Sequence, residues 1–365
     1  MKALVYHKDL NLCGGGEKVC LTTIEVLKEL GFRVTLVTNE LIDWNRIRKL
    51  HNTYVKIDKV VYIREKFECF TVYRRMVNLA RLNRYRLNYD LIINTHGDPL
   101  PLLVDINYIH FPTYYFTYEN LLKVSSLFKK IYYAPMTAYF KLTNYYELAR
   151  VLLANSSFTR EVIRRFIGLD ALVLHPPVEV TNFICYNDVR DDIVVSCGRI
   201  HWEKNYDFIL NVAKVCKDIK FVIIGSLKGE ECKVYYNHLL ERIRKEDIKN
   251  VVIYPNYPRS KQIELYRKAK VYLHAMPHEH FGIAIVEAMA SGLIPVVHAS
   301  GGMYFDIIEK GKYGFAYTTL DECVECIYKA LDNADKMRDK VIRKSLEFSK
   351  ERFKLKMRKV IECLL

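Results

Sequence analysis

The segment "HEHFGIAIVEAMASGLIPVVHASGG" at residues 278–302 places two carboxylates, Glu279 and Glu287, near histidines and among small and apolar residues. A carboxylate in such surroundings is costly unless a metal ion, a structural partner or a substrate compensates it. The pattern predicts a short helix, "AIVEAMAS", preceded by the turn "HFGI" and ended by Gly292. Glu287 then lies one turn into the helix, and Glu279 lies in the loop before it.

The start of this predicted helix is suited to bind an anion. Its first N–H groups and the helix dipole attract negative charge, and Gly282 lets a ligand approach the backbone closely. One carboxylate can then face sugar hydroxyls while the other accepts hydrogen bonds from a ribose. Taken alone, the E-x7-E spacing is better explained by a capped helix that carries a solvated glutamate.

A metal site is the other chemistry that the segment raises. His278, Glu279 and His280 lie on a loop, where adjacent and alternating positions rarely converge on one ion, and the helical H-E-x-x-H arrangement is absent. The pattern D-x-D, which would suit a cation that carries a diphosphate, occurs nowhere in the chain. The residues therefore do not favour a metal ion.

Two cations follow a predicted strand in "CGRIHWEKN" at residues 197–205. Arg199 offers a planar fork to a phosphate, and Lys204 offers a point charge. Together they can neutralise a diphosphate leaving group. Two loop cations on their own are more often simply solvated.

The first half of the chain contributes a glycine loop and a histidine. In "CGGGEK" (13–18), Gly14, Gly15 and Gly16 permit positive φ and close approach to a phosphate or sugar, although neither the dinucleotide nor the P-loop spacing is met. A tight strand–helix turn explains this loop equally well. In "YIHFP", His110 ends a strand, where it can donate to a sugar hydroxyl or serve as a structural hydrogen-bonding group.

These candidate residues need elements that bring them together, and the chain alternates short β-branched runs with helical patterns. Predicted strands of the first half occupy residues 2–7, 33–38, 90–96, 106–110 and 151–156, and those of the second half occupy 192–200, 220–225, 250–255, 270–276 and 293–299. Near-continuous apolar strands between helices indicate parallel sheets that are covered on both faces. The sequence thus predicts an α/β protein with two doubly wound domains facing each other across a cleft, and ligands at the carboxyl ends of the strands.

The paired prolines of "ALVLHPPVEV" (171–180) indicate where the first domain ends. We place the N-terminal domain at residues 1–178 and the C-terminal domain at 179–345. We expect a C-terminal helix at 346–365, which can pack back on the first domain.

The bulk composition limits the partners. The 365 residues carry a formal net charge of +14, which suggests nucleic acid, acidic lipid or a phosphorylated substrate, or else an organism whose proteins are generally basic. No RNA-binding signature or zinc-finger spacing accompanies the charge, so nucleic acid is not favoured. No run of about 18 apolar residues is present, so we expect no membrane span.

The ten cysteines are expected to be free thiols in a reducing compartment, because "MKALVYHKD" does not continue into a signal peptide. Cys323 and Cys326 form one C-x-x-C at helical spacing. Without a second pair they are expected to share a helix face, with zinc as the less favoured alternative. We expect a cytoplasmic protein.

In combination, the motifs resemble those of the GT-B glycosyltransferases of family 4. The resemblance rests on "GGGEKV", "YIHFPT", "LANSSFTR", "VLHPPVEV", "EKNYDFIL" and the E-x7-E segment followed by Ser300–Gly302, in the same order over nearly the whole chain. Within this family the segments are most similar to those of the eukaryotic α-1,2-mannosyltransferases that extend the dolichol-linked oligosaccharide. Two features depart from that pattern, namely the absence of an N-terminal membrane anchor and Met303 where proline usually follows the glycine pair.

The resemblance implies a GT-B fold with two Rossmann-like domains and a retaining reaction that needs no metal or other cofactor. It implies that Arg199 and Lys204 hold the donor diphosphate and that Glu287 takes the ribose.

The same resemblance assigns the remaining candidates. Glu279 and the backbone of Phe281, Gly282 and Ile283 would hold the transferred sugar and the phosphates. His110 would lie near the reacting carbon. The glycines of the first loop, Gly15 and Gly16 in particular, would approach the diphosphate from the other domain.

The donor and the acceptor remain open at this point. The resemblance favours transfer of mannose from GDP-mannose to a lipid-linked glycan, and residues 111–147, rich in aromatic and basic side chains, are suited to an anionic membrane surface or to a buried helical hairpin. A UDP-sugar donor with a protein, DNA or soluble glycan acceptor is the alternative. A basic binding protein that keeps the fold without catalysis is less favoured, because Arg199, Lys204 and both glutamates are all present.

Overall fold

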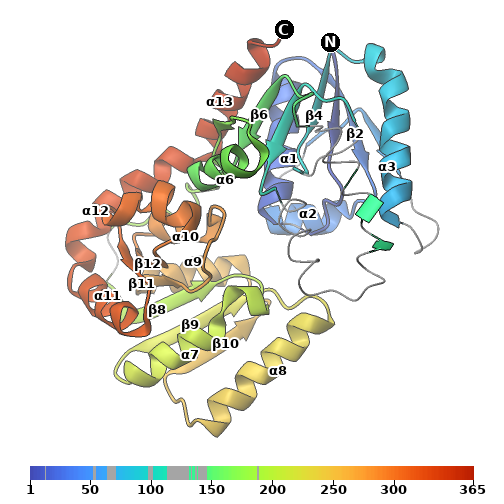
Figure 1. The fold of residues 1–365 in the computed structure, drawn as a ribbon. Coiled ribbons are helices and arrows are strands. Elements are labelled where there is room, and N and C mark those ends of the chain that lie inside the picture. Colours follow the sequence, from blue (N-terminus) through green and yellow to red (C-terminus); the bar gives the residue numbers. More distant parts are fainter. Residues whose placement is uncertain are drawn as a thin grey trace. The chain divides into compact units, whose positions relative to one another are not determined.

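The computed structural model describes residues 1–12, 14–51, 55–63, 71–97, 102–112, 146–186 and 189–365, together with a few positions between 131 and 138. These residues form two compact units (Figure 1). The first unit comprises Met1–Pro177 and Phe353–Leu365, and the second comprises Val178–Arg352. Each unit has its own sheet and its own core.

The first unit is built on a parallel sheet with seven strands among the described residues, in the order β3-β2-β1-β4-β5-β6-β7. The strands are β1 (Lys2–Tyr6), β2 (Arg33–Thr38), β3 (Lys59–Tyr62), β4 (Leu91–Asn94), β5 (Ile106–Ile109), β6 (Val151–Ala154) and β7 (Leu172–Val173). The inner strands are almost entirely buried because helices cover the sheet. Their order brings the carboxyl ends of β1, β4 and β5 next to one another.

The helices of the first unit lie between these strands. They are α1 (Gly15–Glu29), α2 (Trp44–His51), α3 (Thr71–Leu82), the 3₁₀ helix η1 (Asn83–Asn88) and α6 (Ser157–Ile167). The C-terminal helix α13 (Lys350–Glu362), red in Figure 1, buries its apolar residues from Phe353 onward in the core of this unit. Lys354 and Arg358 of α13 also bind Glu29 at the end of α1.

The second unit has a parallel sheet with the order β10-β9-β8-β11-β12-β13. The strands are β8 (Asp191–Cys197), β9 (Lys220–Gly225), β10 (Val251–Pro255), β11 (Ala269–His274), β12 (Ile294–His298) and β13 (Phe315–Tyr317). Because β8, β11 and β12 are neighbours, the loops that follow them leave the sheet side by side. This edge holds most of the candidate residues of the second unit.

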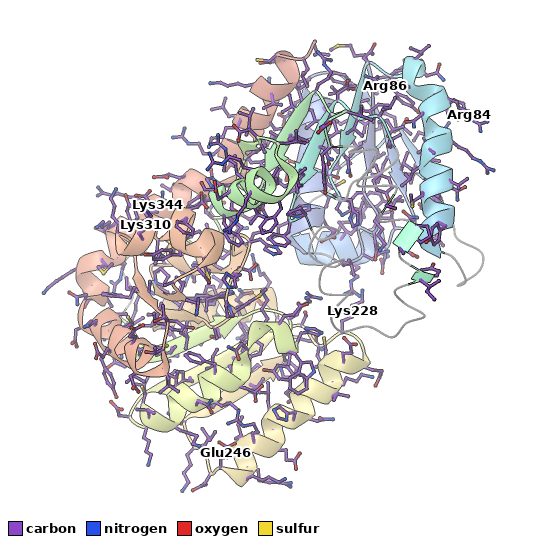
Figure 2. All side chains as sticks on the ribbon, in the orientation of Figure 1. Arg84, Arg86, Lys228, Glu246, Lys310 and Lys344 are labelled. Carbon is purple, nitrogen blue, oxygen red and sulfur yellow. The ribbon has the colours of Figure 1, made fainter. Side chains whose placement is uncertain are left out.

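Helices join the strands of the second unit. They are η2 (Trp202–Lys204), α7 (Tyr206–Val215), α8 (Glu230–Lys245), α9 (Arg259–Lys268), α10 (Ile283–Ala290), η3 (Met303–Ile307), η4 (Glu309–Gly311), α11 (Leu320–Asp332), α12 (Ala334–Ser345) and η5 (Leu346–Phe348). One buried charge of this framework lies between two carboxylates. Lys344, labelled in Figure 2, is 4% exposed and binds Glu309 at 2.5 Å and Glu347 at 2.6 Å.

The predicted architecture of two α/β units with parallel sheets is confirmed. The sequence did not predict β3, β7 or β13. β3 is an edge strand with exposed ends, β7 has only two residues and β13 only three, so none of them carries the continuous apolar run of the central strands. Cys323 and Cys326 both lie on α11, and Cys323 is buried there.

The sequence makes two predictions about membranes, namely a membrane-facing segment at 111–147 and the lack of a membrane span. Residues 113–130 and most of 131–145 lie outside the described residues, so the aromatic and basic segment at 111–147 is not described as a whole. Within the part of the chain that the structure describes, no helix combines the length and the apolar character needed to cross a bilayer.

Candidate functional site

Lys204 and Glu279 meet at the carboxyl edge of the second unit's sheet. Lys204 ends η2, which follows β8, and Glu279 lies in the loop after the neighbouring strand β11. The Lys204 Nζ and Glu279 Oε2 atoms are 2.5 Å apart, and the two side chains are only 19% and 16% exposed. The sequence places both residues in one site, and the structure brings them into direct contact.

Charge and burial oppose each other at Glu279. Burial raises the pKa of this carboxyl, but the ammonium of Lys204 and the nearby His274 lower it by more, so that the pKa lies well below its usual range. His274 Nε2 is 3.2 Å from Glu279 Oε2, and burial lowers the pKa of His274. Glu279 is therefore a carboxylate at neutral pH, with a side chain that is largely shielded from solvent.

The loop that carries Glu279 is held by a backbone hydrogen bond at His278. His278 has a φ of 55°, and its N–H donates to Ser300 Oγ at 2.8 Å. Among the residues that the structure describes, no three histidine, cysteine, aspartate or glutamate side chains converge as they would around an ion.

The glycine pair after β12 supports this loop. Gly302 N–H donates to the Glu279 carbonyl oxygen at 2.9 Å. Gly301 has a φ of 73°, and a Cβ atom there would lie 2.3 Å from the same carbonyl oxygen. The close backbone contact therefore requires glycine at position 301.

The junction between this loop and α10 is shaped for a ligand that contacts backbone. Gly282 precedes the helix with a φ of 107°. The Phe281 side chain is 3% exposed and packs edge-on against Phe348 at 5.4 Å, and Ile283 packs against the core. The Phe281 side chain is thus turned into the core, and Gly282 has no side chain, so the backbone of these two residues lies beside the first turn of α10.

Arg199 is placed differently from Lys204. Its side chain is 63% exposed, and it pairs with Glu203 at 3.1 Å within the same loop. In the described residues it contacts neither Lys204 nor Glu279. The predicted diphosphate-binding pair is thus present in one loop, with one cation buried against a carboxylate and the other at the surface.

Glu287 has a partner that the sequence did not reveal. Its side chain is 4% exposed, and its two oxygens accept from Arg259 NH1 and NH2 at 2.8 and 2.7 Å. Arg259 is the first residue of α9, after β10. Burial lowers the pKa of Arg259, and Glu287 raises it by more, so the net pKa is raised. Arg259 could have been found from the sequence, because it is a cation that follows a strand end. Arg199 was identified by the same feature.

In the first unit, the glycine loop takes a conformation that differs from the prediction. Gly14 is the N-cap of α1 with a φ of −98°, and Gly15 and Gly16 belong to the first turn of the helix. Positive φ is therefore not the reason for these glycines, and that part of the prediction is wrong. Gly16 packs against a side chain instead, because a Cβ atom there would lie 3.2 Å from His110 Nε2.

His110 follows β5 and is half-buried. Its Nε2 atom is 2.9 Å from the carbonyl oxygen of Thr95, so Nε2 carries the proton and donates it. Burial lowers the pKa of His110 to about 4, so the imidazole is neutral at physiological pH. Its Nδ1 atom is then a hydrogen-bond acceptor, whereas the sequence suggested that the residue donates.

His7 and Glu17 complete this edge of the first unit. His7 Nε2 is 3.3 Å from Glu17 Oε1, and His7 Nδ1 is 3.1 Å from Thr95 Oγ1. Glu17 Oε2 accepts from the Gly14 N–H at 2.5 Å. Thr95 therefore contacts both histidines, and Glu17 fixes the loop at the start of α1. The sequence analysis missed His7, Thr95 and Glu17, because their contacts depend on strand order.

Each unit matches a family model. Residues 13–182 match the family described as Glycosyltransferase Family 4, and residues 186–348 match the one described as Glycosyl transferases group 1. The two matches meet near the division between the units.

Curated relatives share part of the chain. The GDP-Man:Man(3)GlcNAc(2)-PP-Dol alpha-1,2-mannosyltransferase of Caenorhabditis elegans is 30% identical over 60% of this chain and 52% of its own length. The protein of the same name from Dictyostelium discoideum is 24% identical over 71% of this chain and 59% of its own. A probable sucrose-phosphate synthase of Thermosipho melanesiensis is 32% identical over 49% of this chain and 44% of its own. The chain thus spans about half the length of the curated relatives it matches.

Solved structures match over the whole chain. Anabaena HepE in complex with UDP and glucose has a TM-score of 0.72 at 16% identity, with 99% of both chains covered. The sucrose-phosphate synthase of Thermosynechococcus elongatus has a TM-score of 0.73 at 12% identity, covering 100% of this chain and 99% of that one. At these identities the likeness concerns the fold. The chain therefore combines a domain that matches Glycosyltransferase Family 4 with a domain that matches Glycosyl transferases group 1, in the GT-B fold of its structural neighbours.

Proposed function

We propose that the chain is a retaining, metal-independent glycosyltransferase that moves a hexose from a nucleoside diphosphate sugar to a glycan acceptor. The observation that carries the proposal is the half-buried contact between Lys204 and Glu279, in the loops before α10. A half-buried ammonium near a helix N-terminus is suited to a diphosphate, and a carboxylate held ionised beside it is suited to sugar hydroxyls.

The chemistry follows from the charges that develop. When the sugar leaves, negative charge accumulates on the nucleoside diphosphate, and the protein must stabilise it. Lys204, the first N–H groups of α10 and the exposed Arg199 supply positive charge without a metal. Glu279 keeps Lys204 in place before the donor arrives, and it can accept hydrogen bonds from the sugar while Lys204 turns to the phosphate.

The first unit offers groups of its own that are suited to a sugar or an anion. His110 presents Nδ1 as an acceptor for a hydroxyl, and the N–H groups at the start of α1 are oriented for an anion.

Mannose from GDP-mannose is the donor we favour, and a lipid-linked glycan at the cytoplasmic membrane face is the acceptor. The similarity to the mannosyltransferases of C. elegans and D. discoideum supports this choice. A UDP-sugar donor is the second candidate, supported by the fold shared with HepE, which was crystallised with UDP and glucose. Peripheral attachment to an anionic membrane through residues 111–147 belongs to the same proposal.

A panel of nucleoside diphosphates and nucleotide sugars tests the donor by thermal shift, because a ligand of the native state raises the unfolding temperature. Stabilisation by GDP and GDP-mannose supports the first candidate, and stabilisation by UDP and UDP-sugars supports the second. No stabilisation by any nucleotide would contradict both. Mass analysis of products on lipid-linked and soluble glycans then identifies the acceptor.

A further inference from the structure

Arg259 and Glu287 form a bidentate ion pair in the second unit, at the site of the proposed ribose contact. Both carboxylate oxygens accept from the guanidinium, at 2.7 and 2.8 Å. The carboxylate side chain is 4% exposed, while the arginine side chain is 38% exposed. A charge as buried as that of Glu287 is tolerated only when a partner compensates it, and Arg259 is that partner.

The guanidinium itself is held on two sides. Its Cζ atom lies 4.4 Å from the centre of the Phe183 ring, and NH1 donates to Gln262 Oε1 at 3.1 Å. Phe183 is fully buried, and its carbonyl oxygen accepts from Ser291 Oγ at 2.9 Å just after α10. The arginine therefore has little freedom to rotate, and its orientation determines that of the carboxylate.

We propose that Arg259 is a positioning residue that orients the Glu287 carboxylate toward the ribose diol, so that the protein selects ribonucleoside over 2′-deoxyribonucleoside diphosphates. This inference rests on the proposed function, since it requires a nucleotide donor. It adds a selectivity and the residue that sets it.

One carboxylate can serve a guanidinium and a ribose diol together. An ionised carboxylate has about four lone-pair positions, and the guanidinium fork uses two of them. A ribose diol can donate hydrogen bonds to the same two oxygens. A carboxylate that is free to rotate would meet a diol less often in the required orientation, and a buried carboxylate that loses its cation would have to reorient or take up a proton.

The test is a comparison of dissociation constants for GDP and 2′-deoxy-GDP, and for UDP and 2′-deoxy-UDP, by isothermal titration calorimetry. Hydrogen bonds to a charged group imply that the wild type prefers the ribonucleotide by roughly 10- to 100-fold. In Arg259→Gln and Glu287→Gln this ratio should fall close to one. Arg259→Lys keeps the charge but loses the fork, so its ratio should lie between those of the wild type and Arg259→Gln.

Two control variants separate selectivity from general damage. Arg267→Gln removes an exposed arginine of the same helix and should leave both affinities unchanged. Lys204→Ala should weaken the ribo and deoxy ligands by the same factor, because its proposed contact is with the diphosphate. Circular dichroism establishes that each variant is folded, and Arg259→Lys provides the test if Arg259→Gln does not fold.

The outcomes distinguish this inference from the proposed function. If the wild type binds no nucleoside diphosphate, the proposed function fails and the inference fails with it. If the wild type binds but does not discriminate, or if folded Arg259→Gln or Arg259→Lys keeps the full wild-type ratio, only the role of Arg259 is overturned. Loss of the ratio in Arg259→Gln with partial recovery in Arg259→Lys supports it.

Discussion

His110 donates its Nε2–H to the carbonyl oxygen of Thr95 at 2.9 Å, and Thr95 directly follows the neighbouring strand β4. This hydrogen bond raises the pKa of His110, but burial of the imidazole lowers it by more. Burial lowers its pKa from an ordinary 6.5 to about 4. The contact therefore has a consequence for stability as well as for the proposed site.

The free energy of unfolding should rise with pH between about pH 4 and 6.5. In this range the unfolded chain binds a proton at His110 that the folded chain does not, so protonation favours unfolding as the pH falls. His7, whose pKa burial also lowers, acts in the same direction. The contribution of His110 is at most about 3 kcal/mol. Urea titrations across this range should show a flatter pH dependence for His110→Gln than for the wild type.

The corresponding titration of His175→Gln, a histidine outside the contacts of His7, Thr95 and His110, controls for the loss of any imidazole. If His110→Gln keeps the full wild-type slope, the lowered pKa of His110 does not contribute to acid sensitivity.

Lys204→Ala should reduce transfer by roughly 100-fold or more, because it removes the buried cation proposed for the leaving diphosphate. It should also lower the free energy of unfolding by a few kcal/mol, on the order of the cost of breaking a buried ion pair, since Glu279 is left without its partner. Initial rates and urea unfolding measure the two effects.

The double variant Lys204→Met with Glu279→Gln separates them. Removing both charges should restore most of the stability, because no unpaired charge remains, while the activity stays low. Lys217→Ala, at an exposed lysine before the amino end of β9, is the matched single-charge control and should leave both quantities near wild type. Wild-type turnover in Lys204→Ala would remove the central support for the proposed function.

Glu17→Ala should destabilise the first unit by about 2 to 3 kcal/mol. It removes the acceptor of the Gly14 N–H, a helix cap typically worth about 1 kcal/mol, and it leaves the buried His7 without a partner at Nε2. Glu17→Gln keeps an acceptor oxygen and should cost less than half as much. Urea unfolding measures both, and equal losses in the two variants would indicate that Glu17 contributes through packing alone.

The fold could be predicted because central parallel strands are buried on both faces and carry continuous apolar runs, as in "KFVIIG" and "DLIINTH". Ligands of such sheets bind at the carboxyl ends of the strands, and this rule was enough to select Lys204, Glu279 and His110 as candidates. It could not supply partners, because these depend on which strands are neighbours. His7 and Thr95 are 88 positions apart, and they touch because β1 pairs with β4.

The same limit applies to Glu287 and to the glycine loop. Arg259 lies 28 positions before Glu287, and no sequence spacing links the first turn of α9 to α10. Glycines before a helix are compatible with positive φ or with a helix start that packs closely on a side chain. The structure supports the second explanation, because Gly14 has a negative φ and Gly16 lies in the first turn of α1 against His110.

Gly301→Ala should lower both the stability and the proposed donor affinity. The residue has a φ of 73°, which an alanine adopts with strain of about 1 kcal/mol, and its Cβ would lie 2.3 Å from the carbonyl oxygen of Glu279, so that the loop must move. Gly311→Ala is the matched control, because Gly311 also has a positive φ, 103°, but a Cβ there has no neighbour within 4 Å. Gly311→Ala should therefore show the backbone strain alone and leave nucleotide affinity unchanged. Thermal unfolding and nucleotide titration of both variants measure the difference, and an equal loss in the two would mean that the contact between Gly301 and the Glu279 loop adds nothing to the conformational cost.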